Sequence, residues 1–481
     1  LLSFCFMNAQ DGSLDSSFGD NGVQMQEFDC NHMYLKSVLE LENGSVFISG
    51  LWYYDDYTTF LMQINADGAP VSTYGNNGFY ALPNTFNILQ IEKQLPNNQF
   101  LVFGENTEIN DNVNALYRID EFGSVDLTYG TNGALIPALI ESGKTKYLVL
   151  DDASVLIATH VDDSIIIKKY TDNGILDDAF EEIEISLSNQ QNVDSLFDFK
   201  TSTNGKYYIG LREYDGQEAA HLIYRINQDG SLDASFGDEG VRLLPEPEFS
   251  ETPYVSYLTV LQNNQVVVSR SHSQWWGDVG SPTETKLYKV NSNGSMSNNF
   301  GDAGVLTISN YRGSVREQPN GRLLYFGIVS DFEGGLTVLM NRYDQQGNLD
   351  ASFNLPSNPS GFGSVSMLNH SNEKIYLVGT SVWYSPPTNF TALRYNNSPL
   401  GIEEENATPF SVSPNPSKDI FTISHSSLLS SSKPYAVFDL KGTLLIQGEF
   451  QKQNTEVDLS QYQSGIYLLK VENSTFQLIK N

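Results

Sequence analysis

The four tryptophans of this chain lie close to acidic and aromatic side chains. They are Trp52, Trp275, Trp276 and Trp383, and their neighbours include Tyr53, Tyr54, Asp55, Asp56, His272 and Tyr384. Flat aromatic rings pack against the C–H faces of sugars, carboxylates accept hydrogen bonds from hydroxyls, and the same mixture forms hot spots in protein interfaces. These residues therefore predict a surface that binds a glycan or a protein. The alternative is that the rings cover junctions between packed sheets.

Patterns for catalysis or metal binding are weak in this sequence. The six histidines lack a metal-binding spacing, Gly143-Lys-Thr145 lacks the earlier glycine of a phosphate loop, and no Gly-Xaa-Ser-Xaa-Gly elbow occurs. We predict no catalytic residue, no metal and no cofactor. His160, Asp162 and Asp163 keep an acid/base or metal centre open as an alternative.

Two further function classes compete with a binding module. A propeller enzyme acting on polysaccharide, a hydrolase or a lyase, would need two carboxylates that converge in the fold. A structural or adhesion protein would have no ligand pocket and would bury its tryptophans.

A repeated glycine-centred turn indicates how the tryptophans are positioned. The turn glycines are Gly12, Gly68, Gly123, Gly174, Gly230, Gly294 and Gly347, and the fullest copy reads Asp229-Gly-Ser-Leu-Asp-Ala-Ser-Phe-Gly237. Spacings of 51 to 64 residues suit one four-stranded propeller blade per copy. All four tryptophans follow the second strand of their repeat, in the connection to the third, so we expect them on one face.

Three further strand-like runs recur in fixed order within each repeat, and the first ends in a turn, as at 37–44. The second strands are expected at 45–50, 99–104, 154–159, 206–211, 265–270, 322–327 and 374–379, where nearly unbroken apolar runs predict burial on both faces. The third strands are expected at 59–65, 114–120, 164–171, 221–227, 285–291, 336–344 and 390–396. The last repeat lacks a fourth strand, and residues 22–26 can supply it. We therefore predict an all-β fold with a seven-bladed β-propeller over residues 11–397.

The repeated turn allows a structural and a metal-binding interpretation. Asp-Gly and Asn-Gly pairs supply the positive φ of a tight turn, and Leu232 and Phe236 would close the blade edge. Asp229 and Asp233 could instead be calcium ligands, but two other copies lack one of the oxygens, at Val71 and at Phe122. We favour the turn interpretation.

The turn pattern resembles the delta-60 repeat of bacterial proteins. Residues 11–22 and 229–240 match best, and 172–181 match least because acidic residues follow Phe180. The resemblance covers the whole propeller and implies its fold, but that family has no generally assigned chemistry.

The beginning of the chain indicates export. Residues 1–10 are apolar and end in small and polar residues, as expected for the second half of a secretory signal peptide cleaved near Ala9 or Gln10. The alternative is an ordinary amino-terminal strand. Cys5 and Cys30 are the two cysteines, and removal of the signal leaves Cys30 alone, so we expect no intrachain disulfide.

A second domain follows an acidic, proline-bounded linker at 398–408. Short apolar runs at 410–412, 420–423, 435–438, 444–446, 457–459, 466–471 and 476–479 predict a small Ig-like β-sandwich over 409–481.

The second domain resembles the type A carboxy-terminal sorting domain of the type IX secretion system of Bacteroidetes. The matching motif residues are Pro414, Asn415, Pro416, Gly442, Gly465, Tyr467 and Lys480. The resemblance implies that residues 409–481 engage the secretion machinery and carry the protein across the outer membrane. The product is then secreted or attached to the cell surface after passage through the periplasm. The alternative is an accessory sandwich.

The net charge of −31 limits the choice of partners. Residues 401–481 carry six lysines and nine acids, a charge of −3, so −28 belongs to the rest of the chain. A surface of that sign repels nucleic acid and anionic lipid. We expect a monomer without a transmembrane segment.

Overall fold

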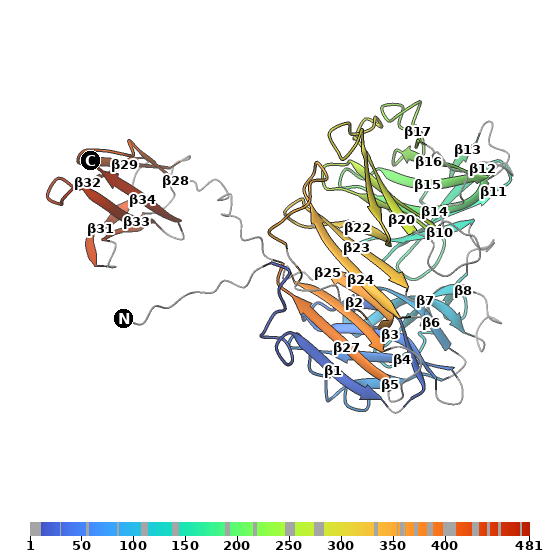
Figure 1. Cartoon of the computed structure of the whole chain (residues 1–481). Helices are drawn as coiled ribbons and strands as arrows, with labels where there is room; N and C mark the ends of the chain where they lie inside the picture. The colour runs from blue at the N-terminus through green and yellow to red at the C-terminus, as the bar shows by residue number, and fades with distance from the viewer. Residues whose placement is uncertain are drawn as a thin grey trace. The chain divides into compact units, whose positions relative to one another are not determined.

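The computed structural model describes residues 11–397 and 410–481 apart from short internal segments (Figure 1). The segments outside the described residues are 29, 54–56, 84–85, 107–113, 137–143, 188–192, 215–218, 246–254, 274–282, 331–334, 354, 356–359, 361, 370–373, 382–387, 426–431, 440–442, 451–453 and 472–473. The chain divides into two compact units, Leu1–Pro399 and Leu400–Asn481. Across the described residues, no helix has the length and apolar character needed to cross a membrane.

Unit 1 contains five antiparallel four-stranded sheets, each with its strands in chain order. The first holds β2 (His32–Glu40), β3 (Val46–Tyr53), β4 (Tyr57–Ile64) and β5 (Phe79–Ala81). The second holds β6 (Phe86–Leu95), β7 (Gln99–Asn106), β8 (Asn114–Ile119) and β9 (Ala134–Leu135), with the 3-10 helix η1 (Pro96–Asn98) between β6 and β7. The third holds β10 (Thr145–Val149), β11 (Val155–Val161), β12 (Ser164–Tyr170) and β13 (Ile183–Ser186). The fourth holds β14 (Val193–Thr201), β15 (Tyr207–Tyr214), β16 (Ala219–Ile226) and β17 (Val241–Leu243). The fifth holds β18 (Val255–Val260), β19 (Val266–Ser273), β20 (Thr283–Val290) and β21 (Val305–Ser309).

A seven-stranded sheet joins the two ends of unit 1. Its order is β1-β27-β26-β25-β24-β23-β22. The strands are β1 (Val23–Phe28), β22 (Arg312–Glu317), β23 (Leu323–Ser330), β24 (Leu336–Tyr343), β25 (Phe362–Asn369), β26 (Ile375–Ser381) and β27 (Thr388–Tyr395). Between β24 and β25 only Leu336 and Phe362 pair, so the sheet consists of two sets of strands. Strand β1 pairs with β27 from Val23↔Leu393 to Phe28↔Thr388. This register confirms that the start of the chain completes the last repeat.

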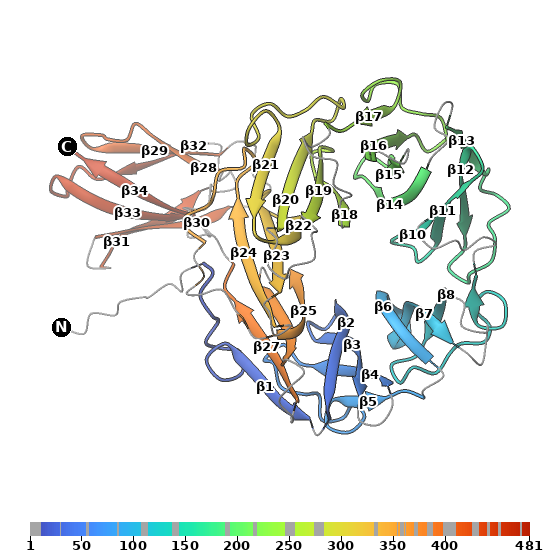
Figure 2. The same ribbon diagram turned by 45° about the vertical axis from the view of Figure 1, so that its right-hand side comes forward.

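The sheets of unit 1 surround a common centre, as in a β-propeller (Figure 2). The strands nearest the centre are β2, β6, β10, β14, β18, β22 and β25, which we call the innermost strands. Strand β2 contacts β25 and β6, β14 contacts β10 and β18, and β18 contacts β22. Side chains on innermost strands of different sheets can therefore act together.

Hydrophobic clusters pack between consecutive sheets of unit 1. In one, Met33 and Val46 of the first sheet pack with Tyr376 and Phe390 of the seven-stranded sheet. In another, Tyr208 of the fourth sheet packs with Leu258 and Tyr288 of the fifth. Each sheet is covered on both faces, and this explains the predicted apolar second strands, in which consecutive residues such as 46–48 are all buried. Burial of each large apolar side chain contributes about 1.5–3 kcal/mol.

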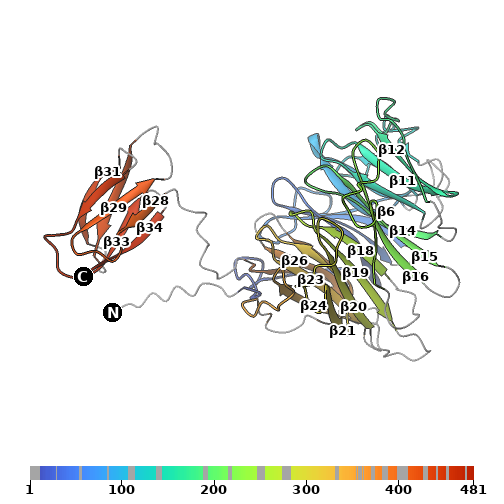
Figure 3. The same cartoon turned by 90° about the horizontal axis from the view of Figure 1, so that it is seen from above.

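Unit 2 consists of two antiparallel sheets around one core. The first contains β28 (Phe410–Ser413), β29 (Ile420–His425) and β32 (Asn454–Asp458). The second contains β30 (Lys433–Phe438), β31 (Leu444–Phe450), β33 (Gly465–Val471) and β34 (Ser474–Lys480). Figure 3 shows β31, β33 and β34 from above. Phe421 and Val457 from the first sheet pack with Val437, Leu469 and Leu478 from the second. All seven predicted strand runs of this unit are strands.

Candidate functional site

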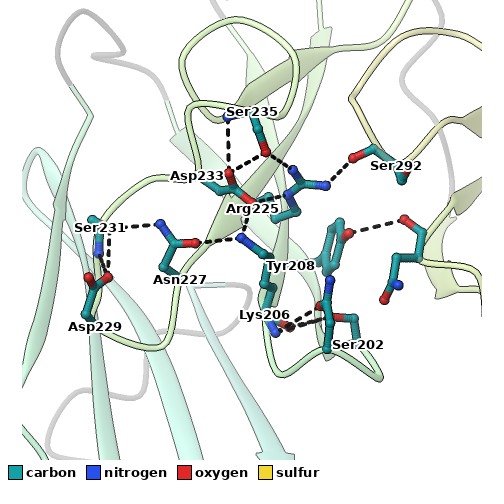
Figure 4. Close-up of polar contacts among 12 residues, drawn as sticks. Ser202, Lys206, Tyr208, Arg225, Asn227, Asp229, Ser231, Asp233, Ser235 and Ser292 are labelled. Atoms are coloured by element: carbon teal, nitrogen blue, oxygen red, sulfur yellow. Dashed lines mark hydrogen bonds and ion pairs between the residues drawn. The ribbon is translucent and has the colours of Figure 1, made fainter.

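The fullest repeat turn contains a buried ion-pair cluster (Figure 4). Asp233 lies 2.8 Å from Arg225 Nε and 2.5 Å from Lys206 Nζ, and its other oxygen accepts hydrogen bonds from Ser235. The Arg225 guanidinium stacks over the ring of Phe236, with 4.6 Å between Cζ and the ring centroid. Arg225 also donates to Ser292 O of the next repeat. The repeat residues therefore fix one turn to the strands before it and to the next turn.

The same arrangement occurs in three further repeats. The arginine, carboxylate and ring are Arg394, Asp15 and Phe18; Arg118, Asp126 and Tyr129; and Arg342, Asp350 and Phe353. Within the chain, the arginine precedes its aspartate by eight residues in three of the four copies, for example at Arg225 and Asp233. Sequence analysis missed these arginines, although the constant spacing was a usable signal.

Consecutive turns also join through their backbones. Gly294 has a φ of +82°, and a Cβ there would lie 2.1 Å from Gly237 N, so this position requires glycine. The N–H of Gly237 donates to Asn293 O at 2.9 Å, and the corresponding bond of Gly301 to Gln346 O is also 2.9 Å. Both oxygens of Asp233 are bound by protein donors, whereas Asp229 accepts from Ser231 within its own turn. These contacts support the turn interpretation over paired calcium ligands.

We expect the corresponding cluster of Arg394, Asp15 and Phe18 to make the free energy of unfolding of unit 1 depend on pH. Burial disfavours the charged form of Asp15, but hydrogen bonds from Ser17 and Lys374 and the charge of Arg394 outweigh it and lower its pKa from 3.8 to about 2. Because the folded-state pKa is lowered, the stabilisation is present above about pH 4 and is lost as the pH falls towards 2. D15N should lower the free energy of unfolding at pH 7 and reduce its slope between pH 4 and 2, as measured by urea unfolding at several pH values. The exposed D20N is the control, and an unchanged slope in D15N would contradict the assignment.

The structure describes part of the predicted aromatic face. Trp52 lies at the end of β3, half-buried against the first hydrophobic cluster, with its ring 5.2 Å from that of Phe79. Tyr53 stacks on His32 at 5.8 Å. His272 lies in β19. The other predicted residues lie outside the described residues: Tyr54, Asp55, Asp56, Trp275, Trp276, Trp383 and Tyr384. The combined surface therefore stays a prediction.

His160 ends its repeat's second strand at the position that Trp52 has in β3. Burial lowers its pKa, and the charge of Lys144 acts in the same direction, while Asp162 and Asp163 oppose them. The histidine is therefore neutral near pH 7.

Sequence analysis did not identify the charged side chains of the innermost strands. Tyr147 donates a 2.7 Å hydrogen bond to Glu92, and Asp198 lies 3.0 Å from Lys200. Burial raises the pKa of Glu92, although Tyr147 and Lys200 act against the rise. Lys200 thus interacts with two carboxylates from different sheets, Glu92 and Asp198. An acid with a perturbed pKa beside an ion pair, such as that of Lys200 and Asp198, is a feature of functional sites.

The sorting motif residues gather around the last strand of unit 2. Asn415 donates to Gln477 O at 2.6 Å and accepts from Ile479 N at 2.9 Å, and it lies between Pro414 and Pro416, both with cis peptide bonds. The Lys480 ammonium donates to Leu459 O at 2.9 Å and to Tyr462 O at 2.7 Å. It also lies 3.0 Å from Asp419.

Two other motif residues also lie within the described part of unit 2. Tyr467 donates to Gln463 O at 2.5 Å, and Gly465 begins β33. Gly442 lies outside the described residues. Asn415, Tyr467 and Lys480 therefore form contacts that hold β34 and the neighbouring turn.

Comparison with known families gives two matches. Residues 411–481 match the model of a secretion system C-terminal sorting domain. Residues 204–236 match a beta-propeller domain of unknown function, DUF5122, and this segment contains the ion-pair cluster of Arg225. A search of the curated proteins finds no match.

Solved structures with similar folds share little sequence with this chain. The polysaccharide lyase Uly1 is 10% identical, with a TM-score of 0.47 over 82% of this chain and 94% of that one. Drosophila Semaphorin 1b, extracellular domains 1-2, is 9% identical, with a TM-score of 0.38 over 80% and 87%. The alpha-L-arabinanase of Penicillium chrysogenum is 10% identical, with a TM-score of 0.32 over 81% and 97%. At these values we draw no functional conclusion from them.

Proposed function

Because this chain is a β-propeller protein with a type IX secretion sorting domain, and is therefore sent through the periplasm to the cell surface or beyond, we propose that its propeller is an extracellular binding module. Its ligand is a glycan or a protein, bound by the aromatic face defined by Trp52, Tyr53, His272 and their predicted neighbours. We further propose seven blades over residues 11–397, a linker at 398–408 and an Ig-like sorting sandwich over 409–481. The hydrophobic clusters between consecutive sheets support the blade number.

The packing of β2 against the seven-stranded sheet is the observation that carries this proposal. Leu35 N donates to Ser364 Oγ at 2.9 Å, and Thr380 Oγ1 donates to Met33 O at 2.8 Å. Trp52 directly pairs with Met33 across β2 and β3, and β26 ends at Ser381, two residues before Trp383. These contacts support the proximity of Trp52 and Trp383 on one face.

We expect a variant with all four tryptophans changed to alanine to lose glycan or protein binding while it remains folded. Each aromatic ring at a binding hot spot contributes about 1–2 kcal/mol or more, so loss of several rings weakens binding at least about a hundredfold. The exported chain and the variant are compared on a glycan array and in pull-downs with surface-exposed proteins, with circular dichroism as the fold check. Equal binding by both proteins would exclude the aromatic face, and binding by neither would favour a structural or adhesion role.

A second candidate function is a polysaccharide-active enzyme. The raised pKa of Glu92, its hydrogen bond from Tyr147 and a second carboxylate, Asp198, that shares Lys200 with it favour this candidate, since glycoside chemistry uses two carboxylates, one of them with a raised pKa. Release of new chain ends from a polysaccharide, lost in E92Q, would support this candidate. Intact polysaccharide after incubation would exclude the enzyme and leave the binding module and the structural or adhesion role.

A further inference from the structure

Basic side chains gather on the innermost strands of a chain whose net charge is −31. Lys146 on β10 interacts electrostatically with Asp198 and Lys200 on β14. Tyr257 on β18 interacts with Asp198 and with Arg312 on β22. These interactions link innermost strands of four consecutive sheets.

Arg316 extends this group along β22. It follows the buried Val315 and is exposed, as expected from the alternation of side chains along a strand. Its side chain forms no hydrogen bond or ion pair with any described residue, and the same is true of Lys146. Lys146 is half-buried, and this burial lowers its pKa, although the charge of Asp198 acts in the opposite direction. Partial desolvation of a cation is costly, so Lys146 would gain from contact with an anion, and the exposed Arg316 is accessible to the same ligand.

We call Lys146, Lys200, Tyr257, Arg312 and Arg316 the central basic cluster. Lys146 and Lys200 lie near Asp198, Tyr257 lies near both Asp198 and Arg312, and burial raises the pKa of Glu92, which interacts with Lys200. This group of residues thus holds more cations than carboxylates, although the chain as a whole is acidic. Tyr257 is 45% exposed and adds a flat ring that can contact the rest of a ligand.

We propose that the central basic cluster binds an oxyanion group, a carboxylate or a sulfate, of an extracellular ligand. The guanidinium groups of Arg312 and Arg316 suit bidentate contacts to such a group, and Lys146 and Lys200 add point charges. The proposal goes beyond the aromatic face, because it involves none of the tryptophans. The ligand is either a free anion or an acidic sugar chain.

Calorimetric titration of the whole chain at low ionic strength tests this site. The ligands are inorganic sulfate, trigalacturonate and the neutral maltotriose. We expect at least one of the anions to bind, maltotriose not to bind through this cluster, and added sodium chloride to weaken anion binding. R316Q and K146Q should each weaken it about tenfold or more, the loss expected for one hydrogen-bonded charge. R242Q, which removes an arginine from the outer strand β17, should bind like the unmodified chain.

The outcomes separate the sources of the oxyanion and the two proposed sites. Binding of sulfate alone identifies a free-anion site, whereas binding of trigalacturonate identifies an acidic glycan. The fourfold tryptophan variant should retain anion binding. Loss of binding on the glycan array would therefore report on the aromatic face, and loss of anion binding would report on the central basic cluster. The proposal is wrong if no anion binds, or if folded R316Q and K146Q bind the anion as tightly as R242Q.

Discussion

Replacement of Arg342 by alanine is expected to destabilise unit 1 by about 3–5 kcal/mol, the cost of breaking a buried ion pair. Arg342 is fully buried, with Nε 2.7 Å from Asp350 and a terminal nitrogen 2.7 Å from Asp11. Asp350 also pairs with Arg322, but Asp11 is itself fully buried and would lose the charge that faces it. Urea unfolding followed by circular dichroism measures the loss as a lower midpoint for the unit 1 transition.

Two variants distinguish the ion pair from a general effect of removing arginine. R242A removes a half-buried arginine from β17, and we expect a change of about 0.5 kcal/mol or less. R342K keeps the charge but loses the planar fork that reaches two carboxylates, so its effect should be intermediate. A midpoint for R342A that equals that of R242A would show that the cluster around Arg342 contributes little.

Replacement of Lys480 by alanine is expected to prevent most of the protein from leaving the cell. The Leu459 and Tyr462 carbonyls would lose the ammonium that satisfies them, at about 1–3 kcal/mol for each buried group. A domain of this size rarely has more than about 3–5 kcal/mol of stability in its core, so the loss unfolds a large fraction of unit 2. Immunoblots of medium, cell surface and periplasm in a host with the secretion system should show the protein retained or degraded in the periplasm.

Lys470 provides the matched control for this experiment. It lies in β33 with an exposed side chain, so K470A removes the same charge without removing the carbonyl contacts. We expect K470A to be exported normally. Normal export of K480A would show that the contacts of Lys480 with the 459–462 turn are dispensable for sorting.

Most of the strand pattern was predictable because it depends on local sequence. The runs at 45–50 and 99–104 became β3 and β7, since consecutive apolar residues can be buried on both faces only between two neighbouring sheets. The missing fourth strand of the last repeat also predicted the pairing of β1 with β27. This prediction succeeded because an unpaired edge strand is unfavourable.

The ion pairs were harder to predict because each depends on side chains from a strand and from separate turns, and on a contact with the next repeat. Asp233 looked like a turn residue or a metal ligand, yet its partners Arg225 and Lys206 come from β16 and from the turn before β15. Likewise, Lys200 meets Glu92 only when sheets far apart in sequence surround one centre. The aromatic face stays a prediction, since most of its residues lie just after strand ends, in segments that the structure does not describe.

The pairing of β1 with β27 also determines when folding can be completed. Val23 pairs with Leu393, 370 positions later, so closure carries a large loop entropy and must follow synthesis of the last repeat. Until then β1 has no strand to pair with, and the hydrophobic face that later packs on Tyr376 and Phe390 is open to water. A chain interrupted before β27 thus keeps an exposed strand edge, a substrate for periplasmic proteases and chaperones. The pairing of β1 with β27 therefore completes the core of unit 1 only after the last repeat is present.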